Sequence, residues 1–216
     1  RGYGWANESR LIYIMDKGGD ENYHLFAVDL DGNNQVELTP FDEVRVSIIN
    51  SLKEQKDHMI ISMNKDNPQI FEPYKINIKT AEYTNDDPAN PISGYDFDKD
   101  GNLRAYTKQQ NGTEYILHYR TDEAEPFKEI IKTTWKDNFY ILRFNYVSDN
   151  PHDAYVVSNI NSNTDEIVLY DLEKKKEIKK VYANDTFDVG GMSVSRKRDF
   201  EVDYFYYTGE KFHLEP

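Results

Sequence analysis

The sequence contains no cysteine, which excludes disulfide bridges, thiolate metal ligands and cysteine nucleophiles. It also has no apolar run that approaches the roughly 18 residues a membrane-spanning helix requires. Basic residues are outnumbered, with 26 Lys and Arg against 39 Asp and Glu, and the resulting net charge of −13 is opposite in sign to what phosphate binding needs. We therefore expect neither nucleic acid nor an anionic membrane surface among the partners.

Aromatic residues are abundant, with 17 Tyr and 11 Phe among the 216 residues. Aromatic and β-branched residues favour strands over helices. Residues 16–39, DKGGDENYHLFAVDLDGNNQVELT, illustrate the recurring pattern. A glycine-rich turn precedes an alternating strand at 24–30, and a tight Asp-Gly-Asn-Asn turn leads into a second strand at 35–38. The composition and this pattern predict an all-β chain.

Equivalent strands recur at a regular spacing along the chain. In four sets, the centres of the second and third strands lie 14 or 15 residues apart, and the third-strand centres advance by 43 to 51 residues between sets. The paired centres are Ile14 and Val28, Ile61 and Ile76, Ala105 and Tyr119, and Val156 and Tyr170. Four short strands that recur about every 45 residues are typical of β-propeller blades. A β-sandwich is the alternative fold, but it does not need a regular repeat of four strands.

We therefore predict that residues 1–216 form a partial β-propeller of about four to five four-stranded antiparallel blades. The blades are expected at residues 10–39, 44–84, 92–131, 140–182 and, incomplete, 187–216. In this interpretation residues 1–9 are a lead-in, residues 85–91 are a linker, and the third strand of the fifth set falls near residue 220, beyond the end. The chain is then cut from a longer propeller. Its open blade edges could be covered by a second copy in a homo-oligomer.

One segment has the spacing of a calcium loop. Residues 96–103, DFDKDGNL, place Asp96, Asp98 and Asp100 at alternate positions, followed by Gly101. However, a threonine stands at the twelfth position of the loop, where a bidentate glutamate belongs, and no flanking helices are expected. Propeller blades often have an Asp-Gly turn between their first and second strands, so we interpret the segment as such a turn and predict no metal site.

Catalytic patterns are absent as well. The five histidines show no metal-ligand spacing; they are His24, His58, His118, His152 and His213. His24 and His118 are expected on strands and are interpreted as packed or edge residues. The nearest approach to a GxSxG nucleophile elbow, at 191–195, lacks the closing glycine and lies in a strand-like run. We interpret it as the first strand of the fifth blade, with Gly190 and Gly191 providing room for packing. We assign no catalytic, cofactor-binding or metal-binding residue and expect no cofactor.

Two segments resemble a known family. Residues 16–45, DKGGDENYHLFAVDLDGNNQVELTPFDEVR, and residues 61–84, ISMNKDNPQIFEPYKINIKTAEYT, are similar to consecutive blades of the prolyl oligopeptidase family of serine peptidases. The similarity is greatest to the branch of acylaminoacyl peptidases and dipeptidyl aminopeptidases. It is strong over residues 11–106 and only blade-like beyond. Ala81 stands where the family's strand motif usually has glycine.

The resemblance implies a propeller joined to an α/β-hydrolase domain with a Ser-Asp-His triad. In that family the propeller caps the active site and admits only small peptides. No triad residue can be assigned here, because the hydrolase domain is not in this sequence, and no Glu-Glu pair for binding a substrate's amino terminus is found. The expected function is thus the non-catalytic propeller portion of a serine peptidase in the cytoplasm or periplasm. The alternative is a stand-alone propeller that serves as a protein or ligand interaction platform.

Overall fold

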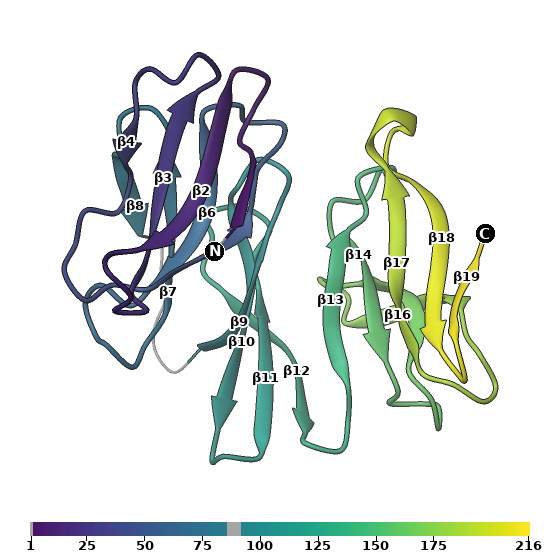
Figure 1. The fold of residues 1–216 in the computed structure, drawn as a ribbon. Helices are drawn as coiled ribbons and strands as arrows, with labels where there is room; N and C mark the ends of the chain where they lie inside the picture. The colour runs from purple at the N-terminus through teal and green to yellow at the C-terminus, as the bar shows by residue number, and fades with distance from the viewer. Residues whose placement is uncertain (1, 86–91) are drawn as a thin grey trace. The chain divides into compact units, whose positions relative to one another are not determined.

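The computed structural model describes residues 2–85 and 92–216, so nearly all of the expected linker at 85–91 lies outside the described residues. The chain divides into two compact units (Figure 1). The first comprises Arg1–Asn90 together with Lys99–Asn102, and the second comprises Pro91–Asp98 and Leu103–Pro216. Each unit is built from small antiparallel sheets of consecutive strands, which we call blades 1 to 5 in chain order.

The first unit contains two four-stranded blades. Blade 1 consists of β1 (Gly2–Trp5), β2 (Arg10–Asp16), β3 (Tyr23–Asp29) and β4 (Val36–Glu37), and blade 2 consists of β5 (Val46–Asn50), β6 (His58–Met63), β7 (Glu72–Asn77) and β8 (Tyr83–Asn85). Their facing side chains form one core, in which Ile12 and Leu25 of blade 1 join Met59 and Ile76 of blade 2. Stacking the two sheets therefore buries apolar faces that a single sheet of this size would leave in water.

The second unit contains three blades. Blade 3 consists of β9 (Ile92–Phe97), β10 (Leu103–Gln110), β11 (Glu114–Tyr119) and β12 (Lys128–Thr134), and blade 4 consists of β13 (Phe139–Phe144), β14 (Asp153–Ser158), β15 (Glu166–Asp171) and β16 (Lys176–Tyr182). Blade 5 consists of β17 (Val189–Ser195), a 3-10 turn η1 (Arg196–Arg198), β18 (Glu201–Thr208) and β19 (Phe212–Glu215). The prediction of an all-β partial propeller with four to five blades is confirmed.

The third strand of blade 4, β15, is apolar because both of its faces are covered by neighbouring blades. Every residue of β15, EIVLYD, is buried. Val168 and Tyr170 pack in the core shared with blade 3, whereas Ile167 packs in a second core with Val189 of blade 5. Successive side chains of a strand point to opposite faces, so a strand covered on both sides becomes a continuous buried run.

Two sequence-based expectations about the ends are wrong. Residues 2–5 are not a lead-in, because Gly2–Trp5 pairs with β2 from Gly2↔Ile14 to Trp5↔Leu11 and completes blade 1. The alternation of glycine with Tyr3 and Trp5 weakened the strand signal, since glycine is depleted in strands. The third strand of blade 5 is β19 and not a segment near residue 220, because the β18–β19 hairpin is tight and pairs Tyr206 with Leu214.

The departure from the family at Ala81 has a structural correlate. Ala81 lies between β7 and β8 with φ 61°, in the left-handed region, and its N–H donates to the carbonyl of Asn77 at 2.9 Å. Glycine adopts this conformation without steric cost, whereas a Cβ atom is disfavoured there. The turn geometry therefore explains why glycine is usual at this position.

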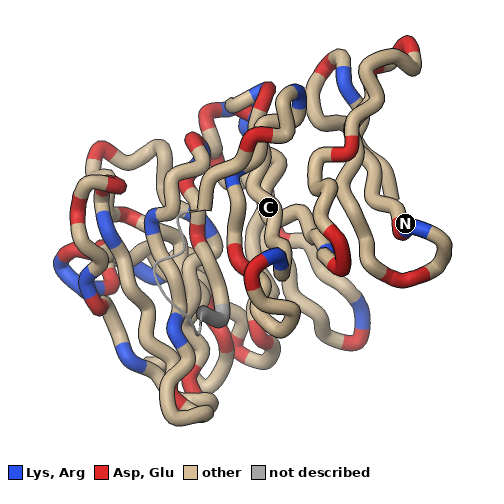
Figure 2. The backbone as a smooth tube through the Cα atoms, turned by 90° about the vertical axis from the view of Figure 1, so that its left-hand side faces the viewer, with Lys and Arg blue, Asp and Glu red and all other residues tan. Residues whose placement is uncertain are grey.

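Acidic residues are spread over the whole chain, many of them in turns between strands (Figure 2). Turns lie at the surface, where ionised carboxylates remain hydrated and keep a β-rich surface soluble. The net charge of −13 thus needs no concentrated acidic site to explain it.

Candidate functional site

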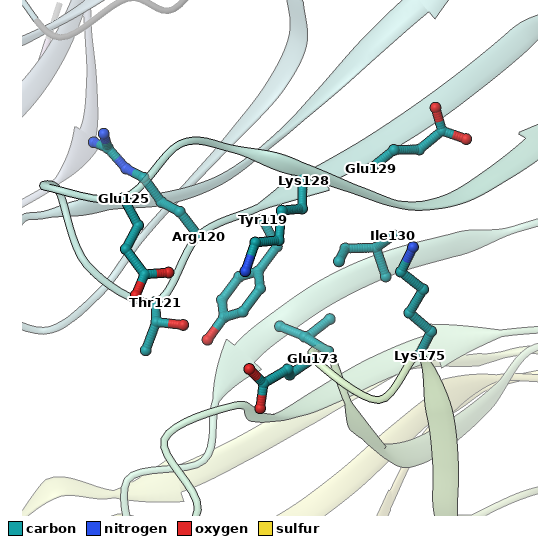
Figure 3. A pocket seen from close by; sticks show the side chains of 10 residues that line it. Tyr119, Arg120, Thr121, Glu125, Lys128, Glu129, Ile130, Glu173 and Lys175 are labelled. Atoms are coloured by element: carbon teal, nitrogen blue, oxygen red, sulfur yellow. The ribbon is translucent and has the colours of Figure 1, made fainter.

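A pocket of about 390 Å³ lies in the second unit, where β11 runs into β12 and β15 runs into β16. Figure 3 shows Tyr119, Thr121 and Glu173 grouped on one side of it, with Ile130 and Lys175 on the other. The volume falls within the roughly 300–1,000 Å³ that is typical of small-molecule sites. The lining residues are Tyr119, Arg120, Thr121, Glu125, Lys128, Glu129, Ile130, Leu172, Glu173 and Lys175.

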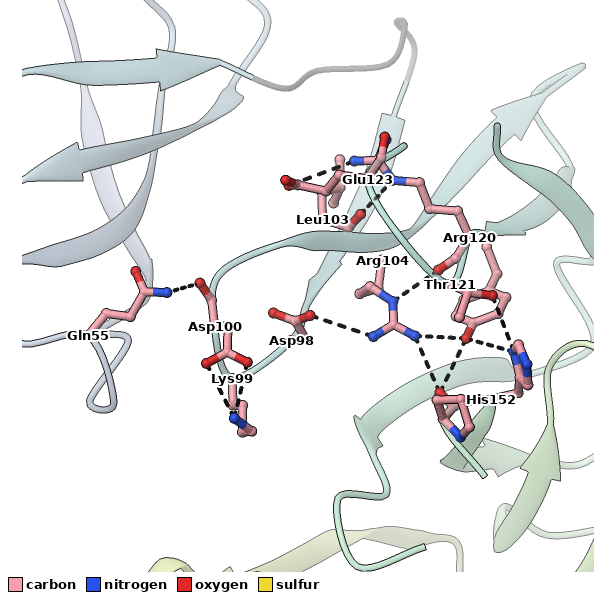
Figure 4. Close-up of polar contacts among 12 residues, drawn as sticks. Gln55, Asp98, Lys99, Asp100, Leu103, Arg104, Arg120, Thr121, Glu123 and His152 are labelled. Atoms are coloured by element: carbon pink, nitrogen blue, oxygen red, sulfur yellow. Dashed lines mark hydrogen bonds and ion pairs between the residues drawn. The ribbon is translucent and has the colours of Figure 1, made fainter. Parts of the chain in front are cut away.

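Arg104, on β10, is the centre of the polar contacts beside this pocket (Figure 4). Its Nη2 donates to the hydroxyl of Tyr119 at 2.8 Å and to the carbonyl of Pro151 at 3.3 Å. Its Nε donates to the carbonyl of Arg120 at 3.0 Å, and its Nη1 lies 3.5 Å from a carboxylate oxygen of Asp98. The guanidinium therefore connects three parts of blade 3 to the loop that precedes β14 of blade 4.

Aromatic rings hold the same guanidinium in place. The ring centroids of Tyr119 and Phe144 lie 5.5 Å and 5.0 Å from its central carbon. Phe144 comes from blade 4, so this contact also joins the two blades. A guanidinium that is packed between rings and saturated with acceptors is rigid, and it fixes the Tyr119 hydroxyl at the mouth of the pocket.

His152 continues the network toward the pocket. Its Nδ1 lies 3.3 Å from the hydroxyl oxygens of both Tyr119 and Thr121, and its Nε2 lies 3.2 Å from a carboxylate oxygen of Glu173. When the Nε2 proton points to Glu173, Nδ1 can accept a hydrogen bond from one of the two hydroxyls. The Glu173 side chain is 57% exposed, so this end of the network faces solvent.

The protonation of Tyr119 limits what the network can do. Burial is the largest influence on this phenol and raises its pKa, while the Arg104 guanidinium acts in the opposite direction. The hydroxyl therefore stays protonated at neutral pH and serves as a hydrogen-bond donor rather than as a base.

Thr121, His152 and Glu173 have the composition of a hydroxyl–imidazole–carboxylate triad. Yet the 3.3 Å between hydroxyl and imidazole exceeds the roughly 2.6–3.2 Å expected of an activated nucleophile, and Tyr119 competes for the same ring nitrogen. Thr121 also follows a strand within a loop and not a strand-to-helix elbow. The arrangement suits binding and positioning of a ligand. The expectation that the chain has no catalytic residue stays a prediction.

The calcium-like segment is separated into three different environments. Asp96 lies on β9, where burial raises the pKa of its carboxyl to about 7. Asp98 faces Arg104, and the backbone carbonyl of Asp100 accepts a hydrogen bond from Lys75 at 3.1 Å. The segment forms the turn between the first and second strands of blade 3. Among the described residues, no group of three or more His, Cys, Asp or Glu is arranged to hold a metal ion.

The other histidines pack against strand neighbours. His24, on β3, is buried with its Nδ1 2.9 Å from the carbonyl of Thr39. His118, on β11, stacks on Tyr106 with centroids 4.6 Å apart, and burial lowers the pKa of its imidazole. His213 stacks in the same way on a tyrosine of β18, and His58 opens β6. His24 also lies 2.8 Å from a carboxylate oxygen of Glu37 on the neighbouring strand β4, so these histidines contact groups within their own sheets.

The serine of the elbow-like run also has a structural position. Ser193 pairs with Tyr204 inside the β17–β18 ladder, so the run is the first strand of blade 5 as predicted. A Cβ atom on Gly191 would lie 2.4 Å from the hydroxyl oxygen of Tyr206, and one on Gly190 would lie 2.9 Å from the same ring. The two glycines thus make room for this tyrosine.

Sequence reasoning missed the network around Arg104. Its members are spread over some 70 residues and come from several separate loops and strands of two blades. Arg104 directly follows the calcium-like segment, but nothing in the sequence indicated its contacts with blade 4. The contacts between His152, Thr121 and Glu173 depend on how the two blades stack, which no spacing along the chain encodes.

Comparison with known proteins finds similarity in sequence as well as in fold. No family model matches the sequence. The chain is 28% identical over 146 residues to dipeptidyl aminopeptidase BIII of Pseudoxanthomonas mexicana, a match that covers 62% of this chain and 21% of that protein. The chain therefore spans about a fifth of the length of this curated relative.

Solved structures show the same fold at low identity. Prolyl oligopeptidase B from Galerina marginata matches with a TM-score of 0.59 and 12% identity, over 95% of this chain and 32% of that one. TolB from Acinetobacter baumannii also matches with a TM-score of 0.59 and 12% identity, over 97% of this chain and 50% of that one. The sequence match to a dipeptidyl aminopeptidase agrees with the resemblance to the prolyl oligopeptidase family, and the solved structures show that the chain shares their propeller fold. No helix of the described residues is long and apolar enough to cross a membrane.

Proposed function

We propose that this chain is the propeller portion of a serine peptidase of the acylaminoacyl or dipeptidyl peptidase type. In this role it covers the active site of an α/β-hydrolase domain of the same parent chain and limits the size of the peptides that enter. The observation that carries the proposal is the 28% identity over 146 residues to dipeptidyl aminopeptidase BIII, in a chain whose blades have the expected architecture.

The physical requirements of such a role are rigidity and exclusion. A domain that restricts access needs no reactive group, but it must not yield when a long peptide presses on it. The continuous cores shared by blades 1 and 2, and by blades 3, 4 and 5, supply that stiffness within each unit. The saturated contacts of Arg104 add a polar link between blades 3 and 4.

The proposal is tested with the chain alone and with the full-length product of its gene. We expect the chain alone to release no product from dipeptidyl chromogenic substrates, while the full-length protein cleaves short peptides far faster than long ones. In the full-length protein, Ile61→Ala removes a fully buried side chain of the blade 1–blade 2 core and should shift cleavage toward longer peptides.

The matched control is Ile49→Ala, which removes the same atoms from a side chain that is 40% exposed, and it should leave the length preference unchanged. Hydrolysis by the chain alone would refute the non-catalytic assignment. An equal shift in both variants would refute the size-limiting role.

The second candidate is a stand-alone propeller that binds proteins or ligands. The fold likeness to TolB over 97% of this chain is compatible with it. The reading frame after residue 216 separates the two candidates. A hydrolase domain with a GxSxG elbow supports the peptidase, whereas further blades followed by a stop codon support the binding platform.

A further inference from the structure

Arg143 lies on β13, the first strand of blade 4, and its side chain is partly buried against blade 5. The central carbon of its guanidinium lies 5.5 Å from the ring centroid of Phe200. In the part of the chain that the structure describes, this guanidinium has no hydrogen-bond partner and no carboxylate within ion-pair distance. A guanidinium has five N–H donors, and at this blade junction none of the described residues accepts from them.

Two other arginines, Arg10, which is buried, and Arg104, which is partly buried, show how unusual this is within the same molecule. Arg10 in blade 1 pairs with Asp29 and donates to the carbonyls of Ile78 and Asn34, each at 3.0 Å. Arg104 in blade 3 has Asp98 and a further set of oxygen acceptors, as described above. Burying a cation is costly unless it is paired and hydrogen-bonded, and the chain meets this requirement at both of those sites.

The surroundings of Arg143 are aromatic and include a second arginine. Tyr146 and Tyr155 lie close enough to interact electrostatically with it, and so does Arg196. Burial is the main cause that lowers the pKa of Arg143, and the neighbouring Arg196 acts in the same direction. Arginine nevertheless stays protonated in proteins, so Arg143 keeps its own positive charge.

The ring beneath the guanidinium is held by an unusual backbone. Phe200 has φ 64° and the preceding Asp199 has φ 49°, both in the left-handed region that bulky residues rarely adopt. The N–H of Phe200 donates to the carbonyl of Ser195 at 2.8 Å, which closes the turn that contains η1. The ring also packs against Tyr146 with centroids 5.0 Å apart. This geometry keeps the aromatic face in place beside Arg143.

We propose that Arg143, backed by Phe200, binds a carboxylate group of a small ligand at the junction of blades 4 and 5. A planar carboxylate matches the fork of a guanidinium with two parallel hydrogen bonds, and it supplies the acceptor that Arg10 and Arg104 receive from aspartates. A single open guanidinium in a chain of net charge −13 suits a monoanion better than a polyanion such as a nucleotide. This carboxylate site does not rest on the proposed function.

The test uses the full 216-residue chain labelled with ¹⁵N, and follows the arginine Nε–Hε signals by NMR. The signal of Arg143 is identified by its loss in Arg143→Gln. We expect N-acetyl-dialanine, which has a free carboxylate, to shift this signal saturably, and its C-terminal amide to bind at least about tenfold more weakly. Acetate alone should compete with N-acetyl-dialanine for the site, which would identify the carboxylate as the recognised group. Inorganic phosphate should bind more weakly than acetate.

Three variants separate binding from general charge effects. Arg143→Gln should abolish the saturable response of its neighbours' backbone amides, and Arg143→Lys should weaken binding about tenfold because a point charge lacks the planar fork. Arg45→Gln removes the same charge from an exposed position and should bind like the parent chain. The proposal would be overturned if the acid and the amide bound equally well. It would also be overturned if Arg143→Gln, with an unaltered melting temperature, still responded to the ligand, or if Arg45→Gln lost as much binding as Arg143→Gln. Tighter binding of phosphate would overturn the ligand class.

Discussion

Arg104 and Arg143 lie at two successive blade junctions of the second unit, yet their partners differ. Each guanidinium packs against a phenylalanine of the next blade, Phe144 at 5.0 Å and Phe200 at 5.5 Å. Arg104 also has a carboxylate and three neutral oxygen acceptors, whereas Arg143 has neither among the described residues. The same residue pair can therefore serve as a saturated structural link or as an open site. The supply of acceptors decides which it is.

The largest effect is expected from breaking the saturated link. Arg104→Met keeps most of the side-chain volume but removes the cation from Asp98 and the donor from Tyr119, so it should lower the free energy of unfolding by about 3 kcal/mol. Urea denaturation of the full chain measures this change. Arg45→Met, at an exposed position, is the control and should change stability by less than about 0.5 kcal/mol. Equal losses in the two variants would mean that the Arg104 contacts contribute nothing specific.

Asp96 is the acidic counterpart of Arg143: it is a partly buried carboxyl on the first strand of blade 3, and no cation of the described residues pairs with it. Burial raises its pKa from 3.8 to about 7 in the folded chain, so the folded state holds a proton that the unfolded state has lost between those values. Ionisation of Asp96 should therefore destabilise the fold progressively as pH rises from about 4 to about 7, with no further loss above that.

Asp96→Asn removes this dependence. The variant should match the parent chain near pH 4 and exceed it by about 1–2 kcal/mol at pH 8, a value reduced from the full pKa shift because the carboxyl retains some solvent access. Denaturation series at several pH values measure the difference. A gap between the two proteins that stays constant with pH would show that Asp96 titrates normally.

The smallest effect is expected at the open site. Arg143→Met removes a guanidinium that satisfies no protein acceptor, so the free energy of unfolding should change by less than about 0.5 kcal/mol in either direction. Compared with the loss in Arg104→Met, this small change would measure how much more the Arg104 junction contributes to the free energy of unfolding than the Arg143 junction. A loss comparable to that of Arg104→Met would indicate a structural role for Arg143 and would argue against an open site.

The blades could be predicted because their information is local. A hairpin of fixed length leaves a fixed spacing between strand centres, and blade stacking makes central strands apolar along their whole length, as in β15. The strands at the two ends of the chain were harder to predict. Gly2 and Gly4 masked β1, and the tight β18–β19 turn shortened the interval that the other blades had suggested.

The sites could not be predicted to the same extent. Arg104 meets the carbonyl of Pro151 and Arg143 meets Phe200 only after neighbouring blades have stacked, so their pairing is a long-range property. The left-handed turn at Phe200 is equally invisible, because nothing in the residue type favours that conformation. At Ala81, by contrast, the unusual residue was noticed in the sequence, and the turn geometry supplied the reason.

The turn Lys99–Asn102 has a consequence for how the chain can be divided. Its residues pack within the first unit, where a Cβ atom on Gly101 would press against Leu52 at 2.7 Å, while the strands that it joins belong to the second unit. No single cut in the polypeptide therefore yields two complete halves. Shuffling of the units between homologues, or their separate production, would strip the first of a fragment that lies on the wrong side of any breakpoint.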